Sequence, residues 1–438
     1  MKINISRSEL SQSAVILLLI FNIVIGSISN YSASSLILKI ISSALLLIAL
    51  YIQFYTNDIP VFQFLKSKQV LKLFYVLLII IIYLSATLLY TSNPGYGLYK
   101  IINIILNAGP NVLAAYILLS ANKLFILNKI ITFSTIIIVS LLILILLLQP
   151  FDHSTIYKFS PGRWSHSIIG RISSFITLII LLFTLIQTES KKIIFYSLVY
   201  GAGVYLTYLT GLRSAFIGLI ILSIIALALK YFYVLRTVST IHASESEDHT
   251  FDSHIHSEST LTPAGRYFSS ISIILILSIV FLVIMFAPSE FQSGKRFENL
   301  TKVENLDFGK DDAILVRLMS YELSLDIIKE HLLLGIGFGG FNGYNNIEWT
   351  RTGKYPHNII LELLSELGIV GLLFFSAILF ITIKAIVKSG LPTIAIYFIL
   401  IPLLFSIWLA MWAKDLSTQS FLWLFLAAYG AKGKELNE

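Results

Sequence analysis

The chain has 438 residues, of which 56% are hydrophobic and 13% are charged, and its formal net charge is +7. A soluble globular domain is roughly 45–50% apolar and about 25% charged, so this composition excludes a soluble domain and predicts a polytopic membrane protein. The chain has no cysteine, which excludes disulfide bonds and thiol chemistry.

Twelve apolar runs follow one another along the chain, and each is long enough to cross roughly 30 Å of hydrocarbon as a helix. They lie at 12–30, 33–54, 70–90, 100–120, 128–149, 167–188, 193–210, 213–235, 268–287, 357–384, 392–413 and 416–431. The first run is interpreted as a span, because no small-residue cleavage site of a signal peptide is evident. The predicted fold class is therefore all-α, a polytopic transmembrane helical bundle of about twelve spans.

Lysines gather in the loops on one side of this predicted bundle. They are Lys2, Lys66, Lys68, Lys72, Lys123, Lys129, Lys191, Lys192, Lys230, Lys384, Lys388, Lys432 and Lys434. Because positive residues favour cytoplasmic loops, both termini are predicted to be cytoplasmic.

Two long loops separate the predicted spans. The inner loop, 237–266, lies within the region of the first nine spans, 1–287, and is acidic and Ser-rich. The spacing of its histidines matches no metal-ligand pattern, so a disordered solvated loop is predicted. The outer loop, 288–356, precedes the last three spans in 357–438. It contains apolar residues at helical spacing, which predicts an amphipathic helix near the outer interface, and the GIGFGGF that follows is predicted to form flexible turns.

Arginines are placed mainly on the outer side, in contrast to the lysines. Among them are Arg163, Arg171, Arg213 and Arg317. Arginine stays charged and binds phosphate through a planar fork of donors, so these residues indicate a phosphate-bearing or diphosphate-bearing ligand. For Arg213, which begins a predicted span, an interface anchor is an equally good interpretation.

The stretch GKYPHNIILELLSELGIVGL carries polar groups at the start of an apolar run and inside it. Pro356 suits a first helical position, so His357 and Asn358 are predicted in the first turn of the tenth span, facing the outer compartment. Glu362 and Glu366 follow Asn358 at intervals of four and share its face of the helix. Ionisable groups inside a span usually face a bundle interior or a watery cavity. The alternative is that the glutamates bond neighbouring helices and that His357 is an interface anchor.

Asp415 lies in a short outer turn between the last two predicted spans. It is a candidate site residue. The alternative is a solvated carboxylate that pairs with Lys414 or caps the last helix.

Four local patterns, with the span count and the long outer loop, resemble the O-antigen ligase and O-antigen polymerase superfamily. They are Thr-Gly-x-Arg-Ser at Arg213, an Arg-led segment ending in G-x-G-x-G-x-F from Arg317 to Phe341, H-N-x-x-x-E-x-x-x-E-x-G-I-x-G from His357 to Gly371, and the aspartate Asp415. The resemblance covers roughly residues 160–420. It implies a membrane-embedded glycosyltransferase at the periplasmic face of the bacterial inner membrane, whose donor is a glycan on undecaprenyl diphosphate.

The resemblance also implies roles for individual residues. Arg213 and Arg317 match arginines assigned to the donor diphosphate, and His357 matches the histidine proposed to activate the acceptor hydroxyl. Asp415 matches a carboxylate. Arg163 and Arg171 lie where polymerases have a basic loop, although the spacing to the following glycine differs. Asn358 and Glu362 are expected to line the substrate cavity.

The favoured function is an O-antigen polymerase that joins lipid-linked repeat units. The first alternative is an O-antigen ligase that transfers the glycan to lipid A-core, and the second is a lipid-linked oligosaccharide transporter. Expected partners are the undecaprenyl-diphosphate-linked glycan, an acceptor glycan or lipid A-core, membrane lipids and a chain-length regulator protein. No metal, other cofactor or nucleic acid is expected, and no nucleotide-binding motif is evident.

Overall fold

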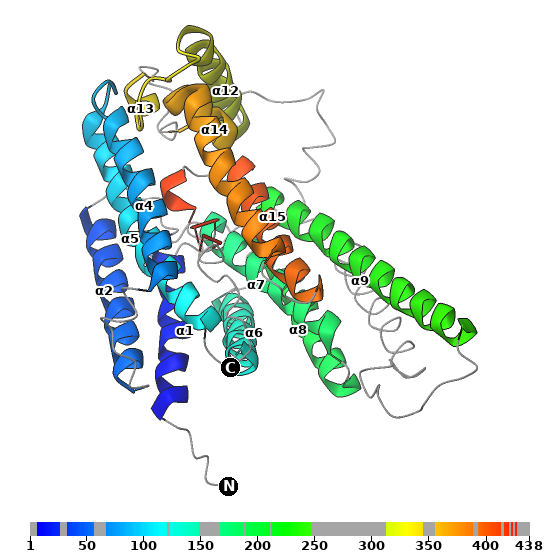
Figure 1. Cartoon of the computed structure of the whole chain (residues 1–438). Coiled ribbons are helices and arrows are strands. Elements are labelled where there is room, and N and C mark those ends of the chain that lie inside the picture. Colours follow the sequence, from blue (N-terminus) through cyan, green and yellow to red (C-terminus); the bar gives the residue numbers. More distant parts are fainter. Residues whose placement is uncertain are drawn as a thin grey trace. The chain divides into compact units, whose positions relative to one another are not determined.

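The computed structural model (Figure 1) describes residues 7–26, 33–56, 67–120, 123–148, 166–187, 189–210, 212–247, 312–344, 355–388, 393–412, 416–419, 422–423 and 425–426. Its helices are α1 Arg7–Gly26, α2 Ala33–Thr56, α4 Lys68–Thr87, α5 Pro94–Ser120, α6 Lys123–Leu148, α7 His166–Ile186, α8 Ser190–Leu209, α9 Arg213–Glu247, α12 Asp312–Glu330, α13 Phe341–Tyr344, α14 Ile359–Val387, α15 Thr393–Trp412 and the 3-10 helix η3 Leu416–Thr418. No strand occurs in these ranges.

The predicted all-α polytopic membrane fold is confirmed. Within the described part of the chain, seven helices are long and apolar enough to cross a membrane, namely α2, α4, α5, α7, α8, α9 and α14. Shorter apolar stretches lie at Lys129–Leu141 and Ile399–Trp412. The span predicted at 268–287 lies outside the described residues, and the span predicted at 416–431 is described only in part, beginning with η3.

Helix α9 is longer than the sequence predicted. It continues to Glu247, so residues 237–247, which were assigned to a disordered loop, are helical. Ala243, Glu245 and Glu247 in this segment have good helix propensity, which is compatible with the extension. The rest of the predicted loop, 248–266, lies outside the described residues.

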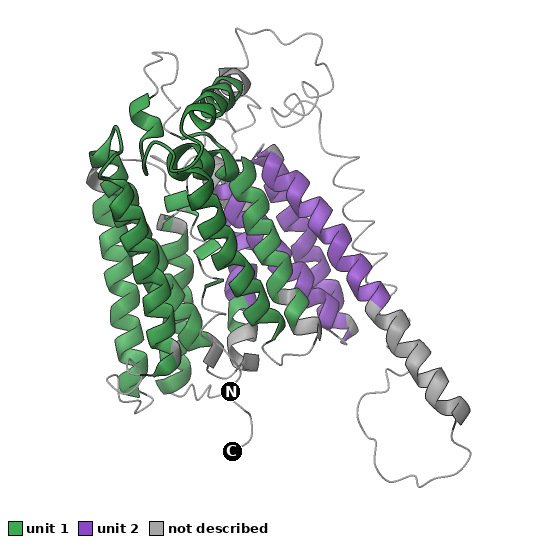
Figure 2. Ribbon diagram, turned by 45° about the horizontal axis from the view of Figure 1, so that its top comes forward, with its two compact units in different colours: residues 1–130, 302–438 green, residues 131–301 purple. Residues whose placement is uncertain are grey.

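The chain divides into two compact units, shown in different colours in Figure 2. Unit 1 comprises residues 1–130 and 302–438, and unit 2 comprises residues 131–301. In unit 1, α5 contacts α1, α2, α4 and η3, and α14 contacts α12, α13 and α15. In unit 2, α7 contacts α8 and α9, which also contact each other.

A row of polar side chains runs along one face of α5 in unit 1. Lys100, Asn103, Asn107 and Asn111 are spaced by three or four residues, so they share a face, and each is 0% exposed. Neighbouring helices supply partners: Lys39 of α2 donates to Asn103 at 3.1 Å. Since an unpaired polar group inside a membrane bundle is costly, these bonds select which helices surround α5.

Unit 2 uses small and hydroxyl side chains for close packing. The hydroxyls of Ser173 in α7 and Thr207 in α8 lie 3.2 Å apart, and Tyr200 of α8 donates to Ser223 of α9 at 2.9 Å. A side chain at Gly203 would collide with Thr177 of α7, so glycine permits α7 and α8 to approach closely.

Candidate active site

The start of α14 differs in detail from the prediction. Asn358 is the residue that caps the helix, and its side chain accepts hydrogen bonds from the backbone of Ile360 at 2.9 Å and Leu361 at 3.3 Å. The helix therefore begins at Ile359, and His357 precedes it, so the placement of His357 and Asn358 in the first helical turn was wrong. An asparagine cap supplies partners for two otherwise unpaired N–H groups, which explains the shift.

His357 has an unusual backbone conformation. Its φ is 58°, and it is the only non-glycine residue with positive φ in the described part of the chain. The ring of Tyr355 lies 4.3 Å from the His357 ring, centroid to centroid. Left-handed backbone is uncommon outside glycine, although histidine tolerates it better than most residues. Such conformations cluster at functional sites, where the surrounding structure holds them in place.

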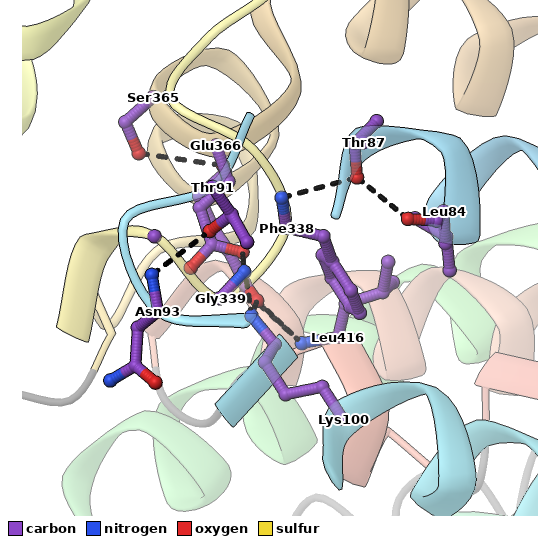
Figure 3. Close-up of polar contacts among 12 residues, drawn as sticks. Leu84, Thr87, Thr91, Asn93, Lys100, Phe338, Gly339, Ser365, Glu366 and Leu416 are labelled. Carbon is purple, nitrogen blue, oxygen red and sulfur yellow. Dashed lines mark hydrogen bonds and ion pairs between the residues drawn. The ribbon is translucent and has the colours of Figure 1, made fainter. Parts of the chain in front are cut away.

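A buried lysine of α5, Lys100, contacts both glutamates of α14. Its ammonium lies 2.6 Å from an oxygen of Glu362 and 2.7 Å from an oxygen of Glu366, and Figure 3 shows Lys100 beside Glu366. These side chains are 0–2% exposed. The same ammonium lies over the ring of Phe338, 4.2 Å from its centroid. Charge neutralisation and a cation–π contact thus compensate the removal of these charges from water.

Backbone N–H groups also donate to both carboxylates. Gly339 donates its N–H to Glu366 at 2.9 Å, and Leu416 donates its N–H to the two oxygens of Glu362 at 3.0 and 3.2 Å. We call Lys100, Glu362 and Glu366, with these two backbone donors, the Lys100 cluster. It joins α5, α14, the segment after α12 and η3 within unit 1.

The turns predicted for the glycine-rich segment 335–340 are present, but the segment is packed into the protein, which was not predicted. All six residues are buried. Phe338 donates its N–H to the Thr87 hydroxyl at 3.2 Å, and Ser92 donates to the Gly340 carbonyl at 2.9 Å. Gly339 has a φ of 79°, and a Cβ there would meet the backbone of Gly97 at 2.6 Å. Glycine is used here for close approach of two backbones, which is a packing role.

This segment and the residues before it supply hydrogen-bond partners where α14 is interrupted. Gly368 has φ 66° and ψ −168°, which interrupts the helix. The N–H of Ile369, which the break frees from the helix, donates to the Leu332 carbonyl at 2.8 Å. The N–H of Ile336 donates to the Ser365 carbonyl at 3.0 Å. Backbone groups freed within a membrane helix must find partners, and here the chain after α12 supplies them.

The predicted helix carrying Arg317 is present as α12. Between Arg317 and Glu330, the part of the helix whose burial is described, the buried residues are Ser320, Ser324 and Ile327, although an apolar face was predicted. Arg317 lies in its second turn and is half-buried. At the exposed end, Lys329 donates a hydrogen bond to Asp326 at 2.8 Å, and this bond raises the pKa of Lys329.

The other predicted site residues belong to different parts of the chain. Arg171 is a buried residue of α7, and Arg213 is the first residue of α9, both in unit 2. Arg163 and Asp415 lie outside the described residues. The structure thus brings Asn358 and Glu362 together with His357 on one helix start, and it links α12, which carries Arg317, to that helix.

Sequence reasoning missed Lys100. The signal was present: a lysine at the start of an apolar run, followed by Asn103, Asn107 and Asn111 at helical spacing, forms a polar face that matches the Glu362 and Glu366 face. Glu362 was expected to contact substrate. Its carboxylate is instead occupied by Lys100 and Leu416 in the structure. Among the described residues, no group of three or more His, Asp or Glu is arranged to hold a metal ion.

A comparison with protein families identifies one match. The family described as O-antigen ligase matches residues 176–376, which include Arg213, Arg317 and His357. No curated protein matches the chain. The resemblance to the O-antigen ligase and polymerase superfamily is confirmed over these residues, and with it a function of the ligase or polymerase type, with a lipid-linked glycan and an acceptor as substrates.

Proposed function

We propose that the chain is an O-antigen polymerase, and the match of residues 176–376 to the O-antigen ligase family supports an activity of the ligase or polymerase type. It joins oligosaccharide repeat units carried on undecaprenyl diphosphate, at the periplasmic face of the bacterial inner membrane. Both chain termini are cytoplasmic in this proposal, and a chain-length regulator protein is a further partner.

The observation that carries the proposal is the setting of His357. It stands in left-handed backbone directly before the capped start of α14, and the Lys100 cluster anchors the next two turns of that helix. A general base must be held at hydrogen-bond distance from the proton that it removes, so a fixed helix start is a suitable platform.

In the proposed reaction the acceptor displaces undecaprenyl diphosphate in one step, either by concerted displacement or through a dissociative transition state. The acceptor hydroxyl oxygen forms a bond to the anomeric carbon of the donor glycan, and His357 takes the hydroxyl proton. The bond between that carbon and the diphosphate oxygen breaks, and its electron pair leaves with undecaprenyl diphosphate. Arg213 and Arg317 neutralise the diphosphate, since the guanidinium fork suits phosphate oxygens. Arg163, Arg171, Asn358 and Asp415 remain proposed substrate contacts.

A ligase is the second candidate, because the matching family is described as O-antigen ligase. In that case the acceptor is lipid A-core and the same residues act on the same donor. Both reactions use the energy of the diphosphate linkage, so purified protein should transfer glycan without ATP. Transfer that requires ATP would instead favour a transporter.

Glycan analysis of a deletion strain separates the two candidates. Loss of a polymerase leaves one repeat unit on lipid A-core, which is the result expected here. Loss of a ligase leaves long chains on undecaprenyl diphosphate. Unaltered surface glycan in the deletion strain would contradict both.

A further inference from the structure

We propose that the Lys100 cluster is a positioning device for the transfer reaction. It fixes the start of α14, which follows His357, relative to the segment that begins at Leu416. Leu416 directly follows Asp415 in the sequence. Lys100, Glu362 and Glu366 are therefore positioning residues, which act without touching the glycan. This inference rests on the proposed function and assigns a role to Lys100, which was not among the predicted site residues.

The burial of the cluster excludes direct contact with a substrate in this conformation. Lys100 and Glu366 are 0% exposed and Glu362 is 2% exposed. Both carboxylates accept hydrogen bonds from Lys100 and from backbone N–H groups. A glycan or diphosphate would have to displace these bonds to reach either glutamate.

The cluster connects three chain segments that each carry a residue of the proposed reaction. Glu362 lies five residues after His357 on α14, and its carboxylate accepts the N–H of Leu416 at 3.0 Å. Asp415 is bonded covalently to Leu416. Glu366 accepts the N–H of Gly339, and residues 331–340 follow α12, which carries Arg317. Lys100 bonds to both glutamates, so one ammonium fixes the geometry of all three segments.

Charged groups suit this task better than apolar packing. Apolar contacts tolerate sliding, whereas an ion pair with hydrogen bonds at 2.6–3.0 Å specifies direction and distance. One lysine and two glutamates sum to a formal charge of −1, and the N–H groups of Gly339 and Leu416 stabilise that excess. The N-terminal end of α14 favours the carboxylate of Glu362 in the same way, since this residue lies in the first turn.

The sharpest test moves one carboxylate and keeps its charge. Glu362→Asp shortens the side chain by one methylene, while Glu362→Gln keeps its length and an oxygen acceptor for the Leu416 N–H. Misplacing a reacting group by about 1 Å can lower a rate by about 100-fold. We expect Glu362→Asp to make at least about 10-fold less polymerised glycan in a complemented deletion strain, and Glu362→Gln to retain more activity than Glu362→Asp.

Donor binding separates positioning from substrate contact. Each purified variant, in lipid nanodiscs, is titrated with undecaprenyl diphosphate and its thermal unfolding is recorded. Binding within about threefold of the unmodified protein is expected for Glu362→Asp, because the cluster holds residues of the chemical step and does not touch the diphosphate. Loss of this binding would make Glu362 a substrate contact and overturn the proposal.

A matched pair of lysine variants controls for the loss of a buried charge. Lys39 is also buried in unit 1, 1% exposed, and donates to Asn103 of α5. Lys100→Met is expected to abolish glycan extension, whereas Lys39→Met, at comparable protein level, is expected to keep it. The proposal fails if Lys100→Met and Lys39→Met lose equal amounts of glycan extension in proportion to their lower unfolding temperatures, while Glu362→Asp keeps normal activity. In that case the role of the cluster is structural only.

The outcome is distinguishable from failure of the proposed function. A deletion strain with normal glycan contradicts the proposed function itself. A deletion strain that lacks long glycan and is fully restored by Glu362→Asp contradicts only the positioning role.

Discussion

The two parts of α14 on either side of Gly368 have similarly apolar sequences but different surroundings. Residues 359–367 are mostly buried, including Glu362 and Glu366, and bond to α5, the segment after α12 and η3. In 369–387 the side chains of Leu373 and Phe380 are 62% and 65% exposed. The first part is fixed by directional bonds, whereas the second part exposes large apolar side chains. Hydropathy alone does not distinguish these two kinds of membrane helix.

The bonds of the first part predict where substitutions will be costly. Removing one partner of a buried ion pair costs about 3–5 kcal/mol, because the remaining charge is left uncompensated. Exposed apolar positions in lipid have no comparable bond to lose. Substitutions in the first part of α14 should therefore lower stability and activity more than substitutions in the second part.

Gly368→Ala has the largest expected effect. The backbone there, φ 66° and ψ −168°, is accessible almost only to glycine, so alanine costs about 1–3 kcal/mol from conformation alone. A Cβ would also collide with the Leu333 carbonyl. We expect a lower unfolding temperature and loss of glycan extension, measured on purified protein and by glycan ladder respectively.

Gly109→Ala in α5 is the matched control. Apart from its chain neighbours and the backbone of its own helix, nothing lies within 4 Å of the Cβ that it adds, and alanine is favoured over glycine in a helix by roughly 0.5–1 kcal/mol. Its unfolding temperature should be unchanged or higher. If both variants behave alike, the break in α14 does not matter for stability.

Arg213→Lys and Arg317→Lys are expected to lose most activity while the protein still inserts. Lysine keeps the charge but not the bidentate fork that fits a diphosphate. The check is glycan chain length together with the amount of protein in the membrane. Near-normal chain lengths in both variants would return these arginines to the role of interface anchors.

Asn358→Ala should have a moderate effect. The Asn358 side chain caps α14 through the N–H groups of Ile360 and Leu361, and loss of such a cap costs about 1 kcal/mol. Asn358→Asp keeps a capping oxygen and should be closer to the unmodified protein in thermal unfolding. Equal unfolding temperatures for Asn358→Ala and the unmodified protein would show that the cap contributes little.

Leu373→Ala, in the second part of α14, should have the smallest effect. Its side chain is 62% exposed and would face lipid, so a change within about 0.5 kcal/mol is expected. Glycan extension should be normal. A loss as large as that of Gly368→Ala would remove the distinction between the two parts of the helix.

Much of this arrangement was predictable from sequence. Apolar runs predicted the membrane helices, and the spacing of Asn358, Glu362 and Glu366 predicted a shared polar face at the start of α14. Such patterns are local, and local periodicity is what a single sequence reports well. The exact start of α14 was missed because the cap at Asn358 competed with the preference of Pro356 for a first helical position.

The partners of that polar face were not predictable in the same way. Lys100 lies 262 residues before Glu362, and nothing in one sequence states which helices become neighbours. The glycine-rich segment 335–340 likewise has a composition typical of flexible turns, yet its glycines permit close packing against α4, α5 and α14. Composition reports conformational freedom, and tertiary contacts decide whether that freedom is used for motion or for close approach.

The most direct test of the central claim is His357→Ala, with glycan transfer and undecaprenyl diphosphate binding measured on the same purified protein. A base in that position contributes about 10²–10⁴-fold to the rate, so transfer should fall by at least about 100-fold. Donor binding should persist, because the arginines hold the diphosphate. Normal transfer by His357→Ala would contradict the assignment of the active site to the start of α14, and loss of donor binding would move His357 into the diphosphate site.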